Sequence, residues 1–196
     1  MGWYVLFVQA GQEDLVRTMI YKFFVRGSIH AIVPKRKIIE RRQGENYEIC
    51  KTMFPGYVFV NTKMNVKTYY KLKKIPRYYR LLNKYQNTNE RDKKLCGLDM
   101  GNVKEDDFEL FSKIEDEEMD QVLQLIGKDE VIDFSFFYVE DGRVTVHDGP
   151  LKGNEGIIKK IDKRKKRARI VLQIMGNEKM IDIGIEMLTP SDNGNC

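Results

Sequence analysis

The hydrophobic pattern at the start of the chain changes from strand-like to helical spacing. The run from Trp3 to Val8 is apolar and rich in β-prone residues, and Gly11 follows it. From Gln12 to Phe24 apolar residues recur at helical spacing, and Glu13 and Asp14 fall in the first turn, where the helix dipole favours acids. This pattern predicts a strand followed by a helix.

Further stretches before residue 83 have strand or helix spacing. In order, they predict a strand at 31–42 interrupted by Pro34, a strand at 57–60 after a Pro55-Gly56 bend, a helix at 66–75 and a short strand at 79–82. Strands and helices therefore mix along this part of the chain. The order predicts an α/β sandwich in which helices cover an antiparallel sheet.

The middle of the chain carries a polar segment and then a second helical pattern. Residues 84–110 are polar, and their asparagines and glycines break any period, so an insertion or flexible loop is expected there. Residues 115–126 carry an apolar stripe behind an acidic start, which predicts a helix. Residues 129–139 are expected to link two domains, although their aromatic residues are unusual for a solvated linker.

The last third of the chain returns to strand spacing. Residues 143–147 alternate between polar and apolar, and Gly149, Gly153 and Gly156 then punctuate two bends before a return strand. Residues 167–174 alternate in the same way, and Gly176-Asn177 is a turn signal. The pattern predicts a small five-stranded β-barrel, and a hairpin in some other small barrel is the alternative.

Charge is concentrated in one place within this predicted barrel. The chain of 196 residues has a net charge of +5, which says little about partners by itself. Eight cations between residues 159 and 169 oppose one acid, Asp162. Arg167 and Arg169 should share a strand face, opposite Ala168 and Ile170. Such a patch can neutralise phosphates, and a solvated hairpin tip is the alternative.

Several classes of function lack the residues they need. Three widely spaced cysteines and two histidines do not form a structural zinc site, and the odd cysteine count fits a reducing cytosol. The sequence has no phosphate-binding loop and no arguable nucleophile–histidine–acid set, so no catalytic residue, metal or cofactor is expected. The first apolar run is too short for a signal peptide or a membrane span, and a cytoplasmic protein is expected.

Three ordered signatures resemble the NusG family of transcription factors. WYVLFVQAGQEDLV at residues 3–16 resembles the opening strand and helix of that family, and FPGYVFV at 54–60 resembles its second signature. Residues 144–188 resemble its KOW barrel. The resemblance implies an α+β protein: a polymerase-binding α/β sandwich at 1–128 with an insertion at 84–110, a linker at 129–139, and a five-stranded KOW domain at 140–190.

The resemblance also implies partners and site residues. The surface for RNA polymerase would contain Trp3, Tyr4, Phe54, Pro55, Gly56 and Tyr57. The loop from Asn61 to Asn65 would lie near the displaced, non-template DNA strand. A monomer with no membrane partner is expected.

The sequence departs from the general elongation factors of this family. Met175 stands where the general factor has an aromatic contact residue, and Asn177 stands where it has a basic one. The resemblance therefore favours the specialised, LoaP-like antiterminator branch, in which the KOW domain recognises RNA, and a leader hairpin is the expected RNA. The candidate RNA-binding residues are Lys152, Lys159, Lys160, Lys163, Arg164, Lys165, Lys166, Arg167 and Arg169. The alternatives are a general elongation factor whose KOW domain binds protein, and a plain RNA-binding or ribosome-associated module.

Overall fold

The computed structural model describes residues 1–82, 111–140 and 143–188, which form an α+β fold. The predicted insertion at 84–110 lies outside the described residues. Contacts between Cα atoms divide the chain into two compact units. The first contains Met1–Val33 and Phe54–Met119, and the second contains Pro34–Met53 and Asp120–Cys196.

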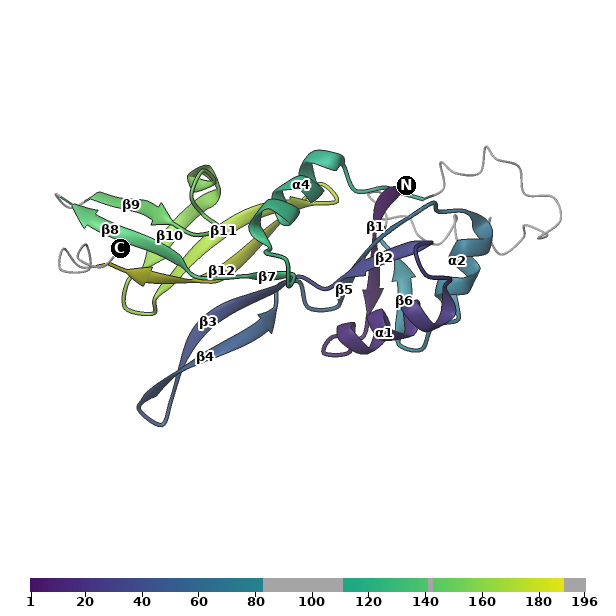
Figure 1. Ribbon diagram of the computed structural model, residues 1–196, viewed down its shortest axis with the longest axis horizontal. Helices are drawn as coiled ribbons and strands as arrows, with labels where there is room; N and C mark the ends of the chain where they lie inside the picture. The colour runs from purple at the N-terminus through teal and green to yellow at the C-terminus, as the bar shows by residue number, and fades with distance from the viewer. Residues whose placement is uncertain (83–110, 141–142, 189–196) are drawn as a thin grey trace. The chain divides into compact units, whose positions relative to one another are not determined.

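The first unit is built on a four-stranded antiparallel sheet of order β2-β5-β1-β6 (Figure 1). Its elements are β1 (Gly2–Val8), α1 (Glu13–Phe23), β2 (Ile29–Ile32), β5 (Tyr57–Thr62), α2 (Val66–Lys73) and β6 (Tyr78–Leu81). The helices and strands predicted for this part of the sequence are therefore present. Strand bounds shift by a few residues, and Pro34, which lacks an N–H group, stands between β2 and the next strand.

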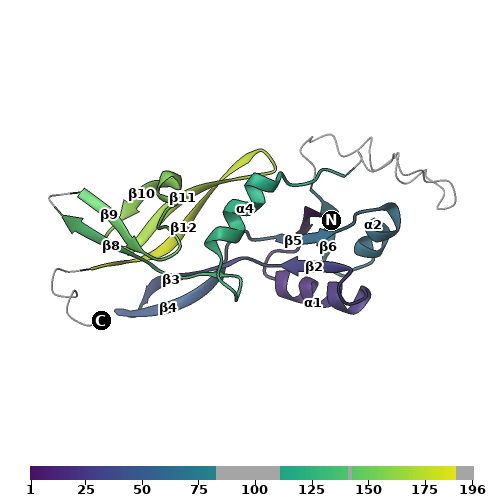
Figure 2. The same cartoon turned by 45° about the horizontal axis from the view of Figure 1, so that its top comes forward.

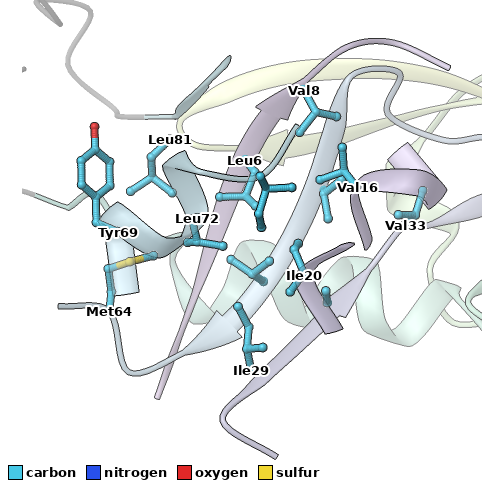
Figure 3. Packing of buried hydrophobic residues seen from close by; sticks show 14 of the residues in the cluster. Leu6, Val8, Val16, Ile20, Ile29, Val33, Met64, Tyr69, Leu72 and Leu81 are labelled. Atoms are coloured by element: carbon cyan, nitrogen blue, oxygen red, sulfur yellow. The ribbon is translucent and has the colours of Figure 1, made fainter. Parts of the chain in front are cut away.

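One apolar cluster joins both helices to one face of this sheet (Figure 3). Leu6 and Val8 alternate along β1 and point to that face. Val16 and Ile20 enter the cluster from α1, and Leu72 enters it from α2. All five side chains are fully buried. Burying each such side chain stabilises the unit by roughly 1.5–3 kcal/mol.

The second unit contains two sheets. The strands of the five-stranded sheet, of order β10-β11-β12-β8-β9, are β8 (Ser135–Glu140), β9 (Arg143–Asp148), β10 (Ile158–Asp162), β11 (Arg167–Ile174) and β12 (Asn177–Met187). A short 3-10 helix (Glu155–Ile157) precedes β10. Figures 1 and 2 show these strands as a curved half-barrel, in which β12 and β8 form the parallel pair. The five-stranded KOW-type sheet predicted from the sequence is present.

A three-stranded sheet of order β4-β3-β7 belongs to the same unit. It contains β3 (Lys35–Arg42), β4 (Glu45–Thr52) and β7 (Val131–Ile132), with α4 (Asp116–Leu125) preceding β7 in the chain. The sequence did not predict β4. Most of its side chains are exposed, so it lacks the apolar alternation that identifies a half-buried strand.

The segment at 129–139, which is expected to link two domains, contains secondary structure. β7 and the start of β8 lie within it, and Phe134, Ser135 and Phe137 are buried. The aromatic residues of this segment therefore belong to the five-stranded sheet and its surroundings. The limits of independently folding domains remain a prediction.

The three glycines of the 149–156 segment have unequal structural roles. Gly149 has φ +93°, and a Cβ added there would lie 2.6 Å from the Phe134 carbonyl oxygen and 2.7 Å from the Ser135 Cα. Gly153 also has a positive φ, +81°, but a Cβ there would meet nothing within 4 Å. Gly156 has neither constraint. Close backbone approach therefore requires glycine at position 149.

No helix among residues 1–82, 111–140 and 143–188 combines the length and apolar character needed to cross a membrane.

Candidate functional site

The turn between β10 and β11 presents a compact group of cations. Asp162 and Arg167 pair across the hairpin, and residues 163–166 form the turn between them. The Lys165 N–H donates to Asp162 Oδ1 at 2.9 Å, and the Lys166 N–H donates to the Lys163 carbonyl at 3.3 Å. The four side chains from Lys163 to Lys166 are exposed. Within the described part of the chain none of them forms an ion pair, so their charges are available to an anionic partner.

The two arginines of β11 are already engaged within the protein. Arg169 donates through Nε and Nη2 to the two carboxylate oxygens of Asp182, at 2.7 and 3.2 Å. This bidentate hydrogen bonding holds the pKa of the Asp182 carboxyl below its usual range. Arg167 is partly buried and donates through Nη2 to the Ile39 carbonyl at 3.1 Å. These two residues therefore differ from the four cations of the turn.

The remaining predicted RNA-binding residues lie on both sides of this turn in the sequence. Lys152, Lys159 and Lys160 are exposed. Lys160 pairs with Arg169 across the β10–β11 ladder. A shallow pocket of about 120 Å³ brings together Lys160, Asp162, Lys165, Arg167, Arg169 and Asp182. Its two acids reduce the net positive charge, so the turn itself is the more cationic part of the patch.

The first unit carries aromatic residues on the sheet face opposite the helix-covered one. Trp3, Phe7 and Tyr57 occupy alternating positions on β1 and β5, and Phe7 lies directly across from Tyr57. The Phe7 and Tyr57 ring centroids are 6.1 Å apart, and the Trp3 ring is 5.8 Å from that of His30. Two of the predicted polymerase-facing residues, Trp3 and Tyr57, thus share a surface with Phe7, which was not predicted from the sequence.

Tyr79 extends this aromatic face and was also missed. Its side chain is 58% exposed, and its ring centroid lies 5.7 Å from that of Phe7. The Arg80 guanidinium lies 5.5 Å from the Phe7 ring centroid, a cation–π distance. The alternation of Trp3, Val5 and Phe7 along one strand could have identified Phe7. The pairing of β6 beside β1, which exposes Tyr79, has no local signal in the sequence.

Two of the predicted polymerase-facing residues, Phe54 and Tyr4, pack against other side chains of the first unit. Phe54 is 4% exposed, with its ring 5.3 Å from Phe59 and stacked on Tyr57 at 6.4 Å. Tyr4 lies on the other face of β1, packed against the apolar cluster, where burial raises the pKa of its hydroxyl. Phe54 therefore supports Tyr57 from beneath, while Tyr4 belongs to the helix-covered face.

The Pro55-Gly56 bend is held by a buried carboxylate. Gly56 has φ +83°, and the Tyr57 N–H donates to the Phe54 carbonyl at 3.0 Å. The Gly56 N–H donates to Glu13 Oε1 at 2.6 Å, and the Gly11 N–H donates to the same oxygen at 3.0 Å. Glu13 is 3% exposed. The sequence suggested only a helix-dipole role for this acid, and its contact with a bend more than forty residues away had no local signal.

The predicted DNA-proximal loop at 61–65 is only partly a loop. Asn61 and Thr62 end β5, and Met64 is 2% exposed. Asn65 caps α2 by accepting a hydrogen bond from the Thr68 N–H at 2.7 Å. Lys63 is the exposed member of the segment among these described residues. A DNA contact here would therefore depend on Lys63 more than on the two asparagines.

Met175 and Asn177 lie at the turn between β11 and β12. Met175 has φ +55° and is 4% exposed, and Gly176 has φ +71°. The Asn177 side-chain amide donates to the Met175 carbonyl at 3.1 Å. Because the Met175 side chain is buried, it offers no surface contact at the position where an aromatic contact residue is expected in general factors.

Within the described residues, histidine, cysteine and acidic side chains form no group suited to holding a metal ion. Cys50 is an exposed free thiol on β4.

Comparison with known proteins matches both halves of the chain. The family model described as "Transcription termination factor nusG" matches residues 1–95. The transcription termination/antitermination protein NusG of Pseudomonas aeruginosa is 24% identical over 187 residues, covering 92% of this chain and 93% of that protein. The Escherichia coli K12 protein of the same name is 24% identical over 190 residues, covering 92% and 91%.

A relative of the same name from Rickettsia prowazekii is 23% identical over 195 residues, covering 97% of this chain and 90% of that protein. A solved structure, "Domain interaction in Thermotoga maritima NusG", aligns over 93% of both chains with a TM-score of 0.48 and 19% identity. The chain is therefore similar to a NusG family model over residues 1–95, and to NusG transcription termination/antitermination proteins over 92% or more of its length.

Proposed function

We propose that this protein is a processive antitermination factor that binds RNA polymerase through its first unit and a nascent RNA hairpin through its five-stranded unit. In this proposal it acts in the cytoplasm as a monomer. The observation that carries it is the β10–β11 turn, where Lys163 to Lys166 place four adjacent, exposed cations that form no ion pair with the described residues. The NusG-like family match supports a role in transcription.

RNA is a suitable partner for this turn on physical grounds. Phosphates attract such a group of cations, and neutralising them releases counterions, which provides affinity at low salt. A turn between two paired strands holds the four charges close together. A folded hairpin presents two phosphate backbones within reach of one compact patch, whereas a protein partner would usually need an apolar centre.

The aromatic face of the first unit is the proposed polymerase-binding surface. Phe7, Tyr57 and Tyr79 supply large, partly exposed rings close to one another, and Trp3 lies on the same face of β1. Aromatic residues dominate the binding energy of protein interfaces. Phe54 and the bend at Pro55-Gly56 would act by holding Tyr57 in place.

A general elongation factor whose KOW unit binds protein is the second candidate. It is favoured by the internal engagement of Arg167 and Arg169, which removes two charges from the proposed RNA patch. The two candidates differ in whether the charges of the turn matter for activity.

Replacing Lys163, Arg164, Lys165 and Lys166 together with alanine should weaken RNA binding by at least about tenfold. The slope of log affinity against log salt should fall by about 3, because each phosphate contact contributes roughly 0.7–0.9. The measurement is a titration of a fluorescently labelled RNA stem–loop with the full-length protein at several salt concentrations.

Arg169→Ala is the matched control for this titration. It removes one charge from the neighbouring strand, but that charge is already paired with Asp182. We expect RNA affinity to fall by less than about twofold, because the paired Arg169 makes no phosphate contact. Equal losses in the two variants, or an unchanged salt slope in the fourfold variant, would contradict the assignment of RNA binding to the turn.

A further inference from the structure

The β3–β4 hairpin and the β10–β11 turn, both in the second unit, line one groove of about 600 Å³. The lining residues are Ile39, Arg41, Gly44, Asn46, Arg164, Lys165, Lys166 and Arg167. Five of these eight residues are cations and none is an acid. The hairpin therefore adds a second wall to the basic turn, contributed by residues outside the basic run at 159–169.

Specific contacts hold the hairpin beside the five-stranded sheet. Arg167 donates to the Ile39 carbonyl of β3 at 3.1 Å, and the Arg36 guanidinium donates to the Asp182 carbonyl of β12. A Cβ added at Gly184 of β12 would lie 2.7 Å from the Lys37 carbonyl oxygen, so the absent side chain lets β3 approach closely. β3 lies against β12 as a result.

Arg41 is the hairpin cation best placed for a ligand. Its Nε donates to the Gly44 carbonyl at 3.2 Å, which orients the side chain across the hairpin end. Within the described residues Arg41 forms no ion pair. Its neighbour Arg42 is paired with Glu40 at 3.2 Å and does not line the groove. Glu40 also forms an ion pair with Lys51.

The size and lining of the groove indicate the chemistry of its ligand. Its volume lies within the range of about 300–1,000 Å³ typical of pockets for organic ligands, so it offers more room than a lone anion needs. It contains no aromatic residue, whereas the buried centres of protein interfaces are rich in them. Asn46 adds an amide that can donate to and accept from a base edge or a 2′-hydroxyl.

We propose that this groove holds the sugar–phosphate backbone of RNA, clamped between Arg41 and Asn46 of the β3–β4 hairpin and the cations of the β10–β11 turn. This inference rests on the proposed RNA-binding function and extends it to a residue outside the KOW-like part of the sequence. Arg41 then completes a binding site that the turn alone would leave open on one side.

The test compares Arg41→Ala with Arg42→Ala in the full-length protein. The probes are a fluorescently labelled RNA stem–loop and a DNA stem–loop of the same sequence, each titrated at several salt concentrations. Arg41→Ala should weaken RNA binding about fivefold to tenfold and lower the salt slope by roughly 0.7–0.9, the share of one phosphate contact. Arg42→Ala should stay within about twofold of the wild type.

The outcomes separate this inference from the function on which it rests. Equal RNA affinities of the Arg41 and Arg42 variants would overturn the proposal that the groove binds RNA. Loss of RNA binding in the fourfold turn variant would in that case still support RNA binding by the turn. Equal binding by wild type and the fourfold variant would overturn both. Displacement of the RNA by polyglutamate at matched charge concentration would overturn the assignment to RNA. Unchanged circular dichroism melting of both arginine variants would exclude misfolding as the cause of a loss.

Discussion

Replacing Gly149 with alanine should lower the free energy of unfolding of the second unit by about 2–5 kcal/mol. The new Cβ would lie 2.6 Å from the Phe134 carbonyl oxygen and 2.7 Å from the Ser135 Cα, which are backbone atoms that cannot simply rotate away. Overpacking of this kind costs roughly 1–3 kcal/mol, and a left-handed conformation adds about 1–2 kcal/mol for a residue with a side chain. Hydrogen exchange of amides in β8, β11 and β12 would measure the change.

Gly153→Ala separates these two effects. Gly153 has φ +81°, close to that of Gly149, but open space surrounds the position of its missing Cβ. Its alanine variant should therefore lose only about 1–2 kcal/mol, the conformational part alone. Equal losses at the two glycines would contradict the close packing of the 149 bend against the chain that enters β8.

Glu13→Ala should lower the free energy of unfolding of the first unit by about 2–4 kcal/mol. It removes a buried carboxylate oxygen that accepts from the Gly56 and Gly11 N–H groups. Hydrogen bonds to charged groups contribute roughly 1.5–3 kcal/mol, and a buried donor left unpaired costs about 1–3 kcal/mol. Chemical denaturation followed by the fluorescence of Trp3, the single tryptophan of the chain, reports directly on this unit.

Asp14→Ala is the matched control for the Glu13 variant. Asp14 is the neighbouring acid in the first turn of α1, and its exposed carboxylate pairs with Arg17 at 3.0 Å. Exposed pairs of this kind contribute about 0.2–1 kcal/mol. We also expect Glu13→Ala, but not Asp14→Ala, to weaken polymerase binding, because the bend that carries Tyr57 would lose its support. A similar stability of the two variants would contradict the role assigned to the buried carboxylate.

Elements with a strong one-sided hydrophobic pattern could be predicted from the sequence. α1, α2 and α4 each bury an apolar stripe, and β11 alternates between buried and exposed residues as its sequence indicates. The general reason is that a half-buried element must place apolar residues at the period of its own geometry. The resemblance in the first and last parts of the chain then assigned these elements to an α+β fold.

The remaining features depend on contacts between residues that are distant in sequence. β4 has exposed, charged side chains and is recognisable only from its pairing with β3. Glu13 looks like any first-turn acid until the 54–57 bend is folded against it. The engagement of Arg167 by Ile39 and of Arg169 by Asp182 likewise cannot be read from a run of cations. The sequence therefore shows where the cations cluster, whereas the structure shows which of them are engaged within the protein.

The groove beside the basic turn illustrates the same limit. Arg41 lies near the end of the strand predicted at 31–42 and Asn46 lies just beyond it, more than a hundred residues before the cations they face. Their contribution follows from the docking of β3 against β12, for which Gly184 gave no recognisable signal. A charged surface is thus better defined by which residues the fold brings together than by how many charged residues lie close together in the sequence.

The central claim is that RNA held by the β10–β11 turn brings this protein to transcribing polymerase and suppresses termination. The direct measurement is readthrough of a terminator in vitro, on templates with and without an upstream hairpin selected for binding to the full-length protein. We expect wild type to raise readthrough severalfold only on the hairpin template, and the Lys163–Lys166 alanine variant to lose that increase. Equal stimulation on both templates, or full activity of the variant, would contradict the claim.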